Sequence, residues 1–289
     1  MAKIIIHYFT GTGNTAHSVK LITEQLQKEN HEVSVWQVKK GVVPPDKSFD
    51  FHIIAFPVLS WSAPSIMKQY LRKLPHVNGT KTAILAINGA IFSKGKLING
   101  YSGQALEQVE CILKRKKYDV FLTSNASFPD NWTQMTPPPS TDECNTIISI
   151  GEADVQTFIT NFLAEKKELY RCGFGNVVWS YIVALLFGTI GRRMLGKFYI
   201  ADEHCTGCGL CVKTCPVNCI KLSEQKPYWA SNCEDCNRCI NICPEKAIQV
   251  SLPILIVQLI SNLAFTIWGI WAVLKYTPTF IQVNSALLI

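Results

Sequence analysis

The sequence lacks the two common glycine-rich nucleotide motifs. Its glycine-rich stretch, TGTGNT at residues 10–15, has neither the Lys of a P-loop nor the Gly-x-Gly-x-x-Gly spacing of dinucleotide-binding folds. We therefore expect no direct NAD(P)H site in this chain.

Charged residues are missing from two long stretches, residues 174–191 and the segment between Lys246 and Lys275. Acidic residues are also absent from residues 171–200, which contain basic residues at positions 171, 192, 193 and 197. This basic stretch suits anionic lipid headgroups or an acidic partner. It is too sparse for a nucleic-acid footprint, and no nucleic-acid motif accompanies it.

The start of the chain has no signal-peptide pattern, because Met1–Ile6 runs directly into a strand pattern. Of the 12 cysteines, those between Cys205 and Cys243 have the spacing of metal ligands rather than that of a disulfide framework. We therefore expect a reducing, cytoplasmic location.

The first half of the chain alternates apolar, β-branched runs with helical patterns. Strands are expected at residues 4–9, 32–38, 51–56, 82–87 and 118–124, and helices at 15–28, 63–74, 102–114 and 153–167. This alternation predicts a doubly wound α/β fold with about five parallel strands. The three prolines at 137–139 predict a surface loop before the last helix.

Four cysteines recur with a displacement of 28 residues, and each half reads Cys-x2-Cys-x2-Cys-x3-Cys-Pro. This is the spacing of two-cluster 4Fe–4S proteins, in which the fourth Cys of each half binds the other cluster. The predicted first set is Cys205, Cys208, Cys211 and Cys243. The predicted second set is Cys233, Cys236, Cys239 and Cys215. Zinc sites use Cys-x2-Cys pairs but rarely three cysteines at this spacing.

A ninth cysteine, Cys219, follows Cys215 by four residues and is expected to be a packed free thiol. Its counterpart in the second half is Ala247.

The glycine-rich stretch lies between the first expected strand and helix, where backbone N–H groups and a helix N-terminus can face one anion. A phosphate monoester bound without magnesium fits best, which favours FMN over a merely tight turn. The residues of this predicted phosphate loop are Thr10, Gly11, Thr12, Gly13, Asn14 and Thr15.

This loop resembles the phosphate loop of flavodoxins, and its fusion to the cysteine repeat resembles the flavodoxin–ferredoxin fusion proteins of anaerobic bacteria and archaea. Further stretches similar to that family are Pro57–Pro64, Phe128–Trp132 and Lys197–Tyr199. The resemblance covers roughly residues 1–250. It implies a flavodoxin-like fold, FMN and low-potential electron transfer.

By the same resemblance, the loops after the third and fourth strands should flank the isoalloxazine ring. The residues expected in these loops are Pro57, Val58, Leu59, Ser60, Trp61, Asn88, Gly89, Ala90, Phe92 and Gly95. Trp61 and Phe92 are the candidates for stacking on the ring, and Asn131 and Trp132 for closing the pocket. Residues 57–64 depart from the family because they contain no Gly.

The apolar stretch 252–274 would be about 34 Å long as a helix, against a hydrocarbon core of roughly 30 Å. Trp268, Trp271 and Tyr276 near one end are typical of interfacial anchors. Two interpretations stay open, a membrane helix and a helix packed on protein. Residues 174–191 are expected to lie on a membrane face, to dock the tail or to pack between domains.

We expect four segments: a flavodoxin-like FMN domain over residues 1–170, a linker helix over 171–200, a small α+β ferredoxin domain with two 4Fe–4S clusters over 201–250, and an apolar tail over 251–289. The expected function is electron transfer with a ferredoxin-type donor or acceptor. Two alternatives are a flavin-dependent reductase of a quinone or disulfide, and a redox subunit or sensor attached to the cytoplasmic face of a membrane.

Overall fold

The computed structural model describes residues 1–133, 136–187, 196 and 198–251. Beyond these it describes positions 253, 256–257, 260–261, 263–269, 271–272 and 275. The chain divides into two compact units, Met1–Gln249 and Val250–Ile289. The phosphate-loop segment and the cysteine repeat therefore lie in the same unit.

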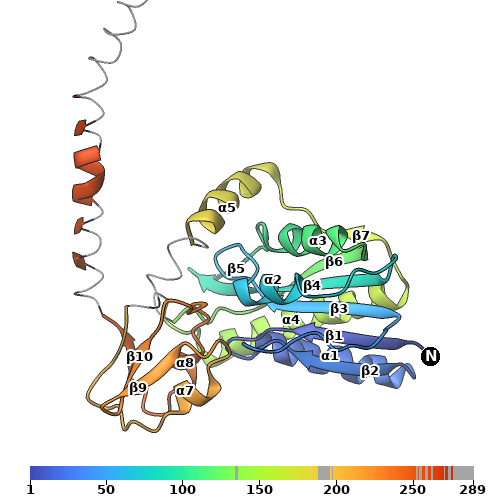
Figure 1. Ribbon diagram of the computed structural model, residues 1–289, viewed down its shortest axis with the longest axis horizontal. Helices are drawn as coiled ribbons and strands as arrows, with labels where there is room; N and C mark the ends of the chain where they lie inside the picture. Colours follow the sequence, from blue (N-terminus) through green and yellow to red (C-terminus); the bar gives the residue numbers. More distant parts are fainter. Residues whose placement is uncertain are drawn as a thin grey trace, which may run out of the picture. The chain divides into compact units, whose positions relative to one another are not determined.

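A parallel sheet organises the first unit (Figure 1). Its strands are β1 (Lys3–Tyr8), β2 (Glu32–Gln37), β3 (Phe51–Pro57), β4 (Lys81–Ser93) and β6 (Asp119–Pro129). They are ordered β2-β1-β3-β4-β6, and each neighbouring pair is parallel. This is the 2-1-3-4-5 order of the flavodoxin-like fold. The predicted doubly wound α/β fold is confirmed.

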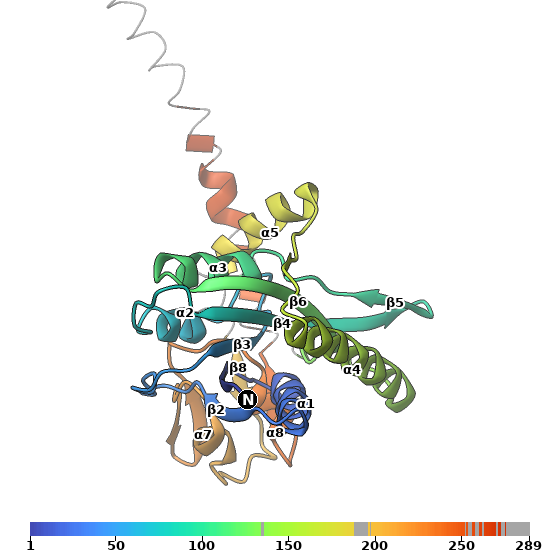
Figure 2. The same cartoon turned by 90° about the vertical axis from the view of Figure 1, so that its right-hand side faces the viewer.

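Helices cover both faces of this sheet (Figure 2). α1 (Asn14–Lys28) and α4 (Thr141–Leu163) pack on one face, and α2 (Ser65–Leu71) and α3 (Ala105–Arg115) on the other. Because both faces are covered, the central strands carry mostly apolar buried side chains, as parallel strands of such sheets do, with His7 and His52 as buried polar exceptions.

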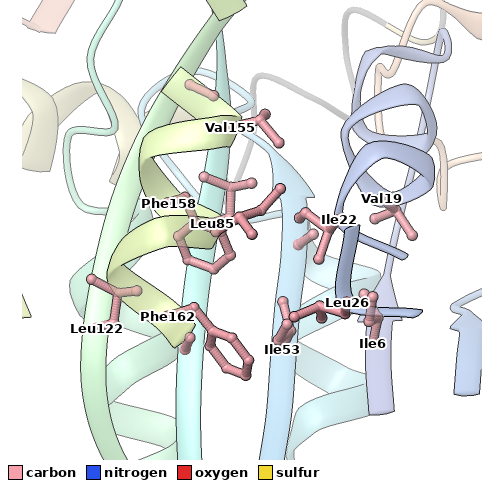
Figure 3. Close-up of a cluster of buried hydrophobic side chains, with 14 of the residues drawn as sticks. Ile6, Val19, Ile22, Leu26, Ile53, Leu85, Leu122, Val155, Phe158 and Phe162 are labelled. Carbon is pink, nitrogen blue, oxygen red and sulfur yellow. The ribbon is translucent and has the colours of Figure 1, made fainter. Parts of the chain in front are cut away.

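The core under α1 and α4 interlocks branched aliphatic and aromatic side chains (Figure 3). Each large side chain buried here stabilises the fold by about 1.5–3 kcal/mol relative to an exposed position. The labelled contributors are Ile6, Val19, Ile22, Leu26, Ile53, Leu85, Leu122, Val155, Phe158 and Phe162. This cluster fixes α1, whose first turn follows the predicted phosphate loop.

The fourth strand does not end where the sequence predicts. β4 continues to Ser93 and turns back into β5 (Lys96–Asn99), which pairs with it antiparallel. Lys94 and Gly95 form the turn, with φ angles of 51° and 72°. Two residues with positive φ suit the twist of a tight hairpin. The predicted loop over 88–95 is therefore wrong for residues 88–93, which belong to β4, and only Lys94 and Gly95 form a turn. A short β7 (Glu168–Leu169), also unexpected, extends the sheet beside β6.

The last helix of the sheet domain begins earlier than predicted, at Thr141 rather than near residue 153. Ser140 caps it: its hydroxyl accepts from the Glu143 N–H, and the Glu143 carboxylate accepts from the Ser140 N–H at 2.9 Å. This is a capping box, whose Ser-x-x-Glu signature directly follows the three prolines. The prolines mark a loop, as predicted.

The cysteine repeat folds into two short helices and paired strands. Its elements are β8 (Tyr199–Ala201), α7 (Leu210–Thr214), β9 (Ile220–Ser223), β10 (Lys226–Trp229), α8 (Arg238–Ile242) and β11 (Ile248–Val250). β9 and β10 form an antiparallel hairpin, and β8 pairs with β11. The two helices are equivalent elements of the repeat, since their first residues differ by 28.

The predicted linker helix exists as α5 (Phe174–Leu186). It buries Ser180 and Ala184, and the Gln104 side chain donates to the Val177 carbonyl at 3.5 Å. The expected tail helix, residues 252–274, lies partly outside the described residues; the described positions between 253 and 275 are helical. Among the residues that the structure describes, no helix is both long and apolar enough to cross a membrane.

Gly151 of α4 tests how tightly this helix packs on β6. A Cβ at this position would lie 2.7 Å from Cε2 of Phe128 and would clash with the Ser127 carbonyl. Helix propensity alone favours Ala over Gly by about 1 kcal/mol. We nevertheless expect Gly151→Ala to lower the free energy of unfolding by about 1–3 kcal/mol, because overpacking outweighs propensity. Urea unfolding under anaerobic conditions measures the change.

The matched control for this variant is Ala153→Gly, at an exposed position of the same helix. It should lower the free energy of unfolding by about 1 kcal/mol through propensity alone. A stabilised Gly151→Ala protein would contradict the close packing of α4 on β6.

Candidate functional site

The predicted phosphate loop connects β1 to α1 at the carboxyl edge of the sheet. Gly13 is the N-cap of α1 with φ of 128°, and the His17 N–H donates to its carbonyl at 2.9 Å. Thr10 and Thr15 are buried. The Thr10 hydroxyl oxygen has no hydrogen-bond partner among the described residues. Because an unsatisfied buried hydroxyl is costly, this loop fits a polar group that supplies the missing partner.

Two hydrogen bonds connect this loop to the end of β6. The Asn131 amide donates to Oγ1 of Thr12 at 2.6 Å, and the Asn14 amide donates to the Pro129 carbonyl at 3.0 Å. Asn131 therefore lies beside the loop, in keeping with its predicted place at the pocket. Its neighbour Trp132 is 41% exposed.

The loop after β3 forms a tight turn without glycine. Leu59 and Ser62 exchange backbone hydrogen bonds of 2.9 and 3.0 Å around it. Ser60 and Trp61 occupy the centre with φ angles of 45° and 58°. Such left-handed conformations cost non-glycine residues about 1–2 kcal/mol each. The Val58 N–H, which donates to the Ile87 carbonyl at 2.8 Å, ties the start of the loop to β4.

Trp61 lies beside an aromatic residue that the sequence did not single out. Its ring centroid is 5.7 Å from that of Tyr101, and both side chains are half-buried. Gly103 leaves room for Cβ of Trp61, and the Gln104 N–H donates to the Trp61 carbonyl at 2.9 Å. No sequence pattern singles out Tyr101; in the structure it follows Gly100, whose N–H donates to the Gly89 carbonyl at 2.9 Å.

Only part of the segment predicted as the loop after the fourth strand lies at the carboxyl edge of the sheet. Asn88 donates its amide to the Ser127 hydroxyl at 3.0 Å, while its Oδ1 is buried without a partner among the described residues. Gly89 packs against Asp130, because a Cβ at residue 89 would lie only 2.7 Å from Oδ1 of Asp130. Ala90 accepts from the Asp130 N–H at 3.0 Å.

Phe92 and Gly95 do not lie in a loop beside the phosphate loop, so their predicted place next to the isoalloxazine ring is wrong. Phe92 pairs with Leu97 inside the β4–β5 hairpin, and Gly95 forms its tip. Figure 2 shows this hairpin projecting beyond the sheet. The structure therefore groups Asn88 and Gly89, but not Gly95, with the ends of the neighbouring strands.

The first cysteine set meets around one cavity. Cys205, Cys208 and Cys211 line it together with Cys243, which comes from the other half of the repeat. Cys208 is exposed, and the other three are half-buried. Cys243 therefore lies beside three cysteines of the first half, and the assignment of these four residues as ligands of one cluster stays a prediction.

The second set gathers in a more enclosed place. Cys215, Cys233 and Cys239 are buried, and Cys236 is half-buried. Burial raises the pKa of the Cys239 thiol to about 12, with further contributions from Cys233 and Cys215. Neighbouring thiolates in such a place repel one another unless a cation compensates them. Iron ions supply that compensation, so these residues fit a cluster.

Cys219 is packed against this second set. Its sulfur lies 3.5 Å from that of Cys215, and it is 2% exposed. The hydrogen bond between the two sulfurs lowers the pKa of Cys215 to about 6, while hydrogen bonds to Cys215 and Cys233, together with burial, raise the pKa of Cys219. Either thiol can be the donor in the bond between Cys215 and Cys219.

The phosphate loop and the second cysteine set are in direct contact. A Cβ on Gly11 would lie 2.7 Å from the Cys236 carbonyl oxygen and 3.0 Å from Cβ of Cys236. Any side chain at residue 11 would therefore force the two segments apart. Nearby, the Lys40 N–H after β2 donates to the carbonyl of Pro216, which follows Cys215, at 2.9 Å.

Two segments of the chain, residues 198–221 and 230–246, match the sequence profiles of 4Fe–4S binding domains. The chain joins a flavodoxin-like fold to a ferredoxin-type 4Fe–4S segment. Comparison with curated proteins gives no match.

Solved structures similar to part of this chain include flavodoxins and a general stress protein. Flavodoxin 2 from Bacillus cereus is 16% identical, covers 54% of this chain and 100% of its own, and has a TM-score of 0.37. Megasphaera elsdenii flavodoxin is 20% identical, covers 53% of this chain and 98% of its own, and has a TM-score of 0.35. General stress protein 14 from Treponema denticola, in complex with FMN, is 14% identical, covers 57% of this chain and 99% of its own, and has a TM-score of 0.38. The fold assignment rests on the strand order rather than on these likenesses.

Exchange of the fourth cysteine predicts which substitutions remove iron. We expect Cys243→Ala to lower the bound iron, because it removes a ligand from the cavity of Cys205, Cys208 and Cys211. Cys219→Ala is the matched control, since the other half has Ala247 at the equivalent position, and it should keep the iron of the wild type. Iron and acid-labile sulfide analysis after anaerobic purification distinguishes the two. If Cys219→Ala lost iron and Cys243→Ala kept it, the assignment of Cys243 and not Cys219 as a cluster ligand would be wrong.

Proposed function

We propose that this protein is an iron–sulfur flavoprotein that relays low-potential single electrons between FMN, two 4Fe–4S clusters and a ferredoxin-type redox protein. The observation that carries the proposal is the contact between Gly11 and Cys236, which places a predicted flavin loop against a predicted cluster ligand. When bound, FMN would supply a two-electron carrier that can exchange electrons singly, as clusters do.

Three features of the phosphate loop support a phosphate monoester. The loop precedes the N-terminus of a 15-residue helix, whose free N–H groups attract anions. Thr10 has a hydroxyl without a partner among the described residues, and the Thr12 hydroxyl can donate its proton while its oxygen accepts from Asn131. The loop contains no lysine for a triphosphate.

The neighbouring loops suit the isoalloxazine ring. Trp61, in the loop after β3, and Tyr101, in the segment after β5, form a half-buried aromatic pair. An aromatic surface of this kind stacks on flat rings. Asn88 has a buried amide oxygen available to accept a hydrogen bond from a ring N–H.

We propose the two swapped cysteine sets as the ligands of two clusters. Cys205, Cys208, Cys211 and Cys243 would hold the first. Their exposure, greatest at Cys208, suits electron exchange with an external protein. The other set would hold the second cluster beside the phosphate loop.

Denaturing the anaerobically purified protein should release FMN rather than FAD, because the loop is built for a terminal phosphate. The double variant Thr10→Val/Thr12→Val should bind FMN at least about tenfold more weakly, since each lost hydrogen bond to a charged group costs about 1.5–3 kcal/mol. Fluorescence titration of the flavin-free protein measures the affinity.

The isosteric control is Thr23→Val in α1, whose hydroxyl bonds to the Val19 carbonyl at 2.8 Å, away from the loop. It should leave the FMN affinity unchanged. Equal affinities of the loop variant and this control would show that the loop does not bind the phosphate.

A reductive titration tests the complete set of carriers. We expect about four electrons per chain, two in FMN and one in each cluster, with about eight iron atoms. Two electrons with flavin alone, or zinc in place of iron, would contradict the proposal.

We further propose attachment to an anionic membrane surface on the cytoplasmic side. Val178, Trp179, Tyr181 and Ile182 of α5 are each about half exposed, which makes an apolar patch. Basic residues at 192, 193 and 197 follow this helix in the sequence, and the apolar stretch 252–274 follows the repeat. An apolar helix next to cations is typical of interfacial membrane binding.

Vesicle sedimentation tests this attachment. The full chain should sediment with vesicles that contain anionic lipid, and Trp179→Ser/Ile182→Ser should bind them several-fold more weakly because it removes apolar area. Val35→Ser, an exposed apolar position on β2, is the control. A detergent-free, monomeric full chain that stays in the supernatant would contradict the proposal.

A further inference from the structure

The second half of the cysteine repeat contacts loops of the flavodoxin-like fold through side chains. The Glu234 carboxylate accepts from the N–H groups of Ser65 and Ile66, both at 2.9 Å, at the start of α2. The Asn241 amide donates to the Asn131 carbonyl at 3.3 Å and to the hydroxyl of Thr133 at 3.2 Å. These contacts bracket Cys236 and Cys239 and hold the second set against the carboxyl edge of the sheet.

Arg238 lies between the phosphate loop and this cysteine set. Its Nη1 donates to the Gly11 carbonyl at 2.8 Å, and the residue lies between Cys236 and Cys239 in the sequence. Its Nε is buried and has no hydrogen-bond partner among the described residues. One residue thus connects both predicted cofactor sites and retains a buried donor for a further acceptor.

The repeat itself shows that these contacts are specific to the second half. With the displacement of 28, the first-half counterparts of the three contacting residues Glu234, Arg238 and Asn241 are Thr206, Leu210 and Lys213. None of these counterparts conserves the acid, guanidinium or amide. The halves therefore share their ligands but differ where the second half meets the flavodoxin-like fold.

The second half also holds its contacting segment in a costly conformation. Asp235 and Asn237 have φ angles of 55° and 58°, where the first half has Gly207 and Gly209. The Tyr199 hydroxyl lies 2.8 Å from Oδ1 of Asp235 and 3.0 Å from Oδ1 of Asn237. The single hydroxyl proton of Tyr199 can bond either oxygen, which offsets part of the strain and holds the backbone on both sides of Cys236.

We propose that Arg238 is the positioning residue that joins the phosphate loop to the second cysteine set, so that the cluster of Cys215, Cys233, Cys236 and Cys239 is the one on the flavin side. This inference rests on the proposed function. It makes the two clusters inequivalent, and it leaves the set around exposed Cys208 facing outward.

The charge of Arg238 has two consequences. A guanidinium is always protonated and, in a partly buried place, interacts strongly with nearby anions. The Arg238 guanidinium, which donates to the Gly11 carbonyl, should stabilise a phosphate group bound in the phosphate loop. It should also stabilise the added negative charge on a reduced cluster bound by Cys236, which raises the reduction potential of that cluster.

The test compares Arg238→Gln with Leu210→Gln, its repeat counterpart, in the full chain with both clusters in place. Arg238→Gln should weaken FMN binding about tenfold, as expected for the loss of one charged hydrogen bond. It should also lower the reduction potential of one cluster, followed by electron paramagnetic resonance during a redox titration. Leu210→Gln should leave the FMN affinity unchanged, and Arg238→Lys should restore most of the potential because it keeps the charge.

Two results would overturn the inference: an FMN affinity in Arg238→Gln equal to that of Leu210→Gln, or an equal shift of both cluster potentials. These differ from a failure of the proposed function. If the wild type holds both cofactors and Arg238→Gln has no effect, only the positioning role fails. If the wild type binds no flavin or no iron, the proposed function itself is contradicted.

Discussion

The structure depends on a van der Waals contact between two backbones, at Gly11 and Cys236. A Cβ at residue 11 would come within 2.7 Å of the Cys236 carbonyl, so no other residue fits without displacing one segment. Glycine in a phosphate loop is usually explained by the approach of the ligand. Here the neighbouring protein segment demands it as well. Together with the hydrogen bonds of Glu234, Arg238 and Asn241, this contact joins the cysteine repeat to the flavodoxin-like fold within one compact unit.

The fold explains why this contact forms at that place. In a doubly wound sheet the carboxyl ends of parallel strands and the first turns of the following helices share one edge. The loops after β1, β3 and β6 all meet there and supply Gly11, Ser65 and Asn131. The cysteine repeat uses that same edge through Arg238 and Glu234. A flavin bound there would therefore have a cluster as its direct neighbour.

The sequence predicts what depends on local spacing and misses what depends on tertiary contact. Apolar runs locate the parallel strands, and the eight spaced cysteines predict the exchanged ligand sets. The β4–β5 hairpin is missed because its turn, Lys94-Gly95, is a weak signal inside a long strand. Tyr101 and Arg238 have no local pattern at all, and only the fold brings them to Trp61 and Gly11. The early start of α4 has a local signal in the sequence, the Ser-x-x-Glu capping box at residues 140–143.

If flavin and clusters exchange electrons within one chain, through the contact that Gly11 makes with Cys236, their reaction is intramolecular. Flash photoreduction of the flavin, with cluster absorbance followed over a range of protein concentrations, tests this exchange. We expect the clusters to become reduced in a first-order phase whose rate does not depend on concentration. A rate proportional to protein concentration, or flavin reduction without any change at the clusters, would contradict it.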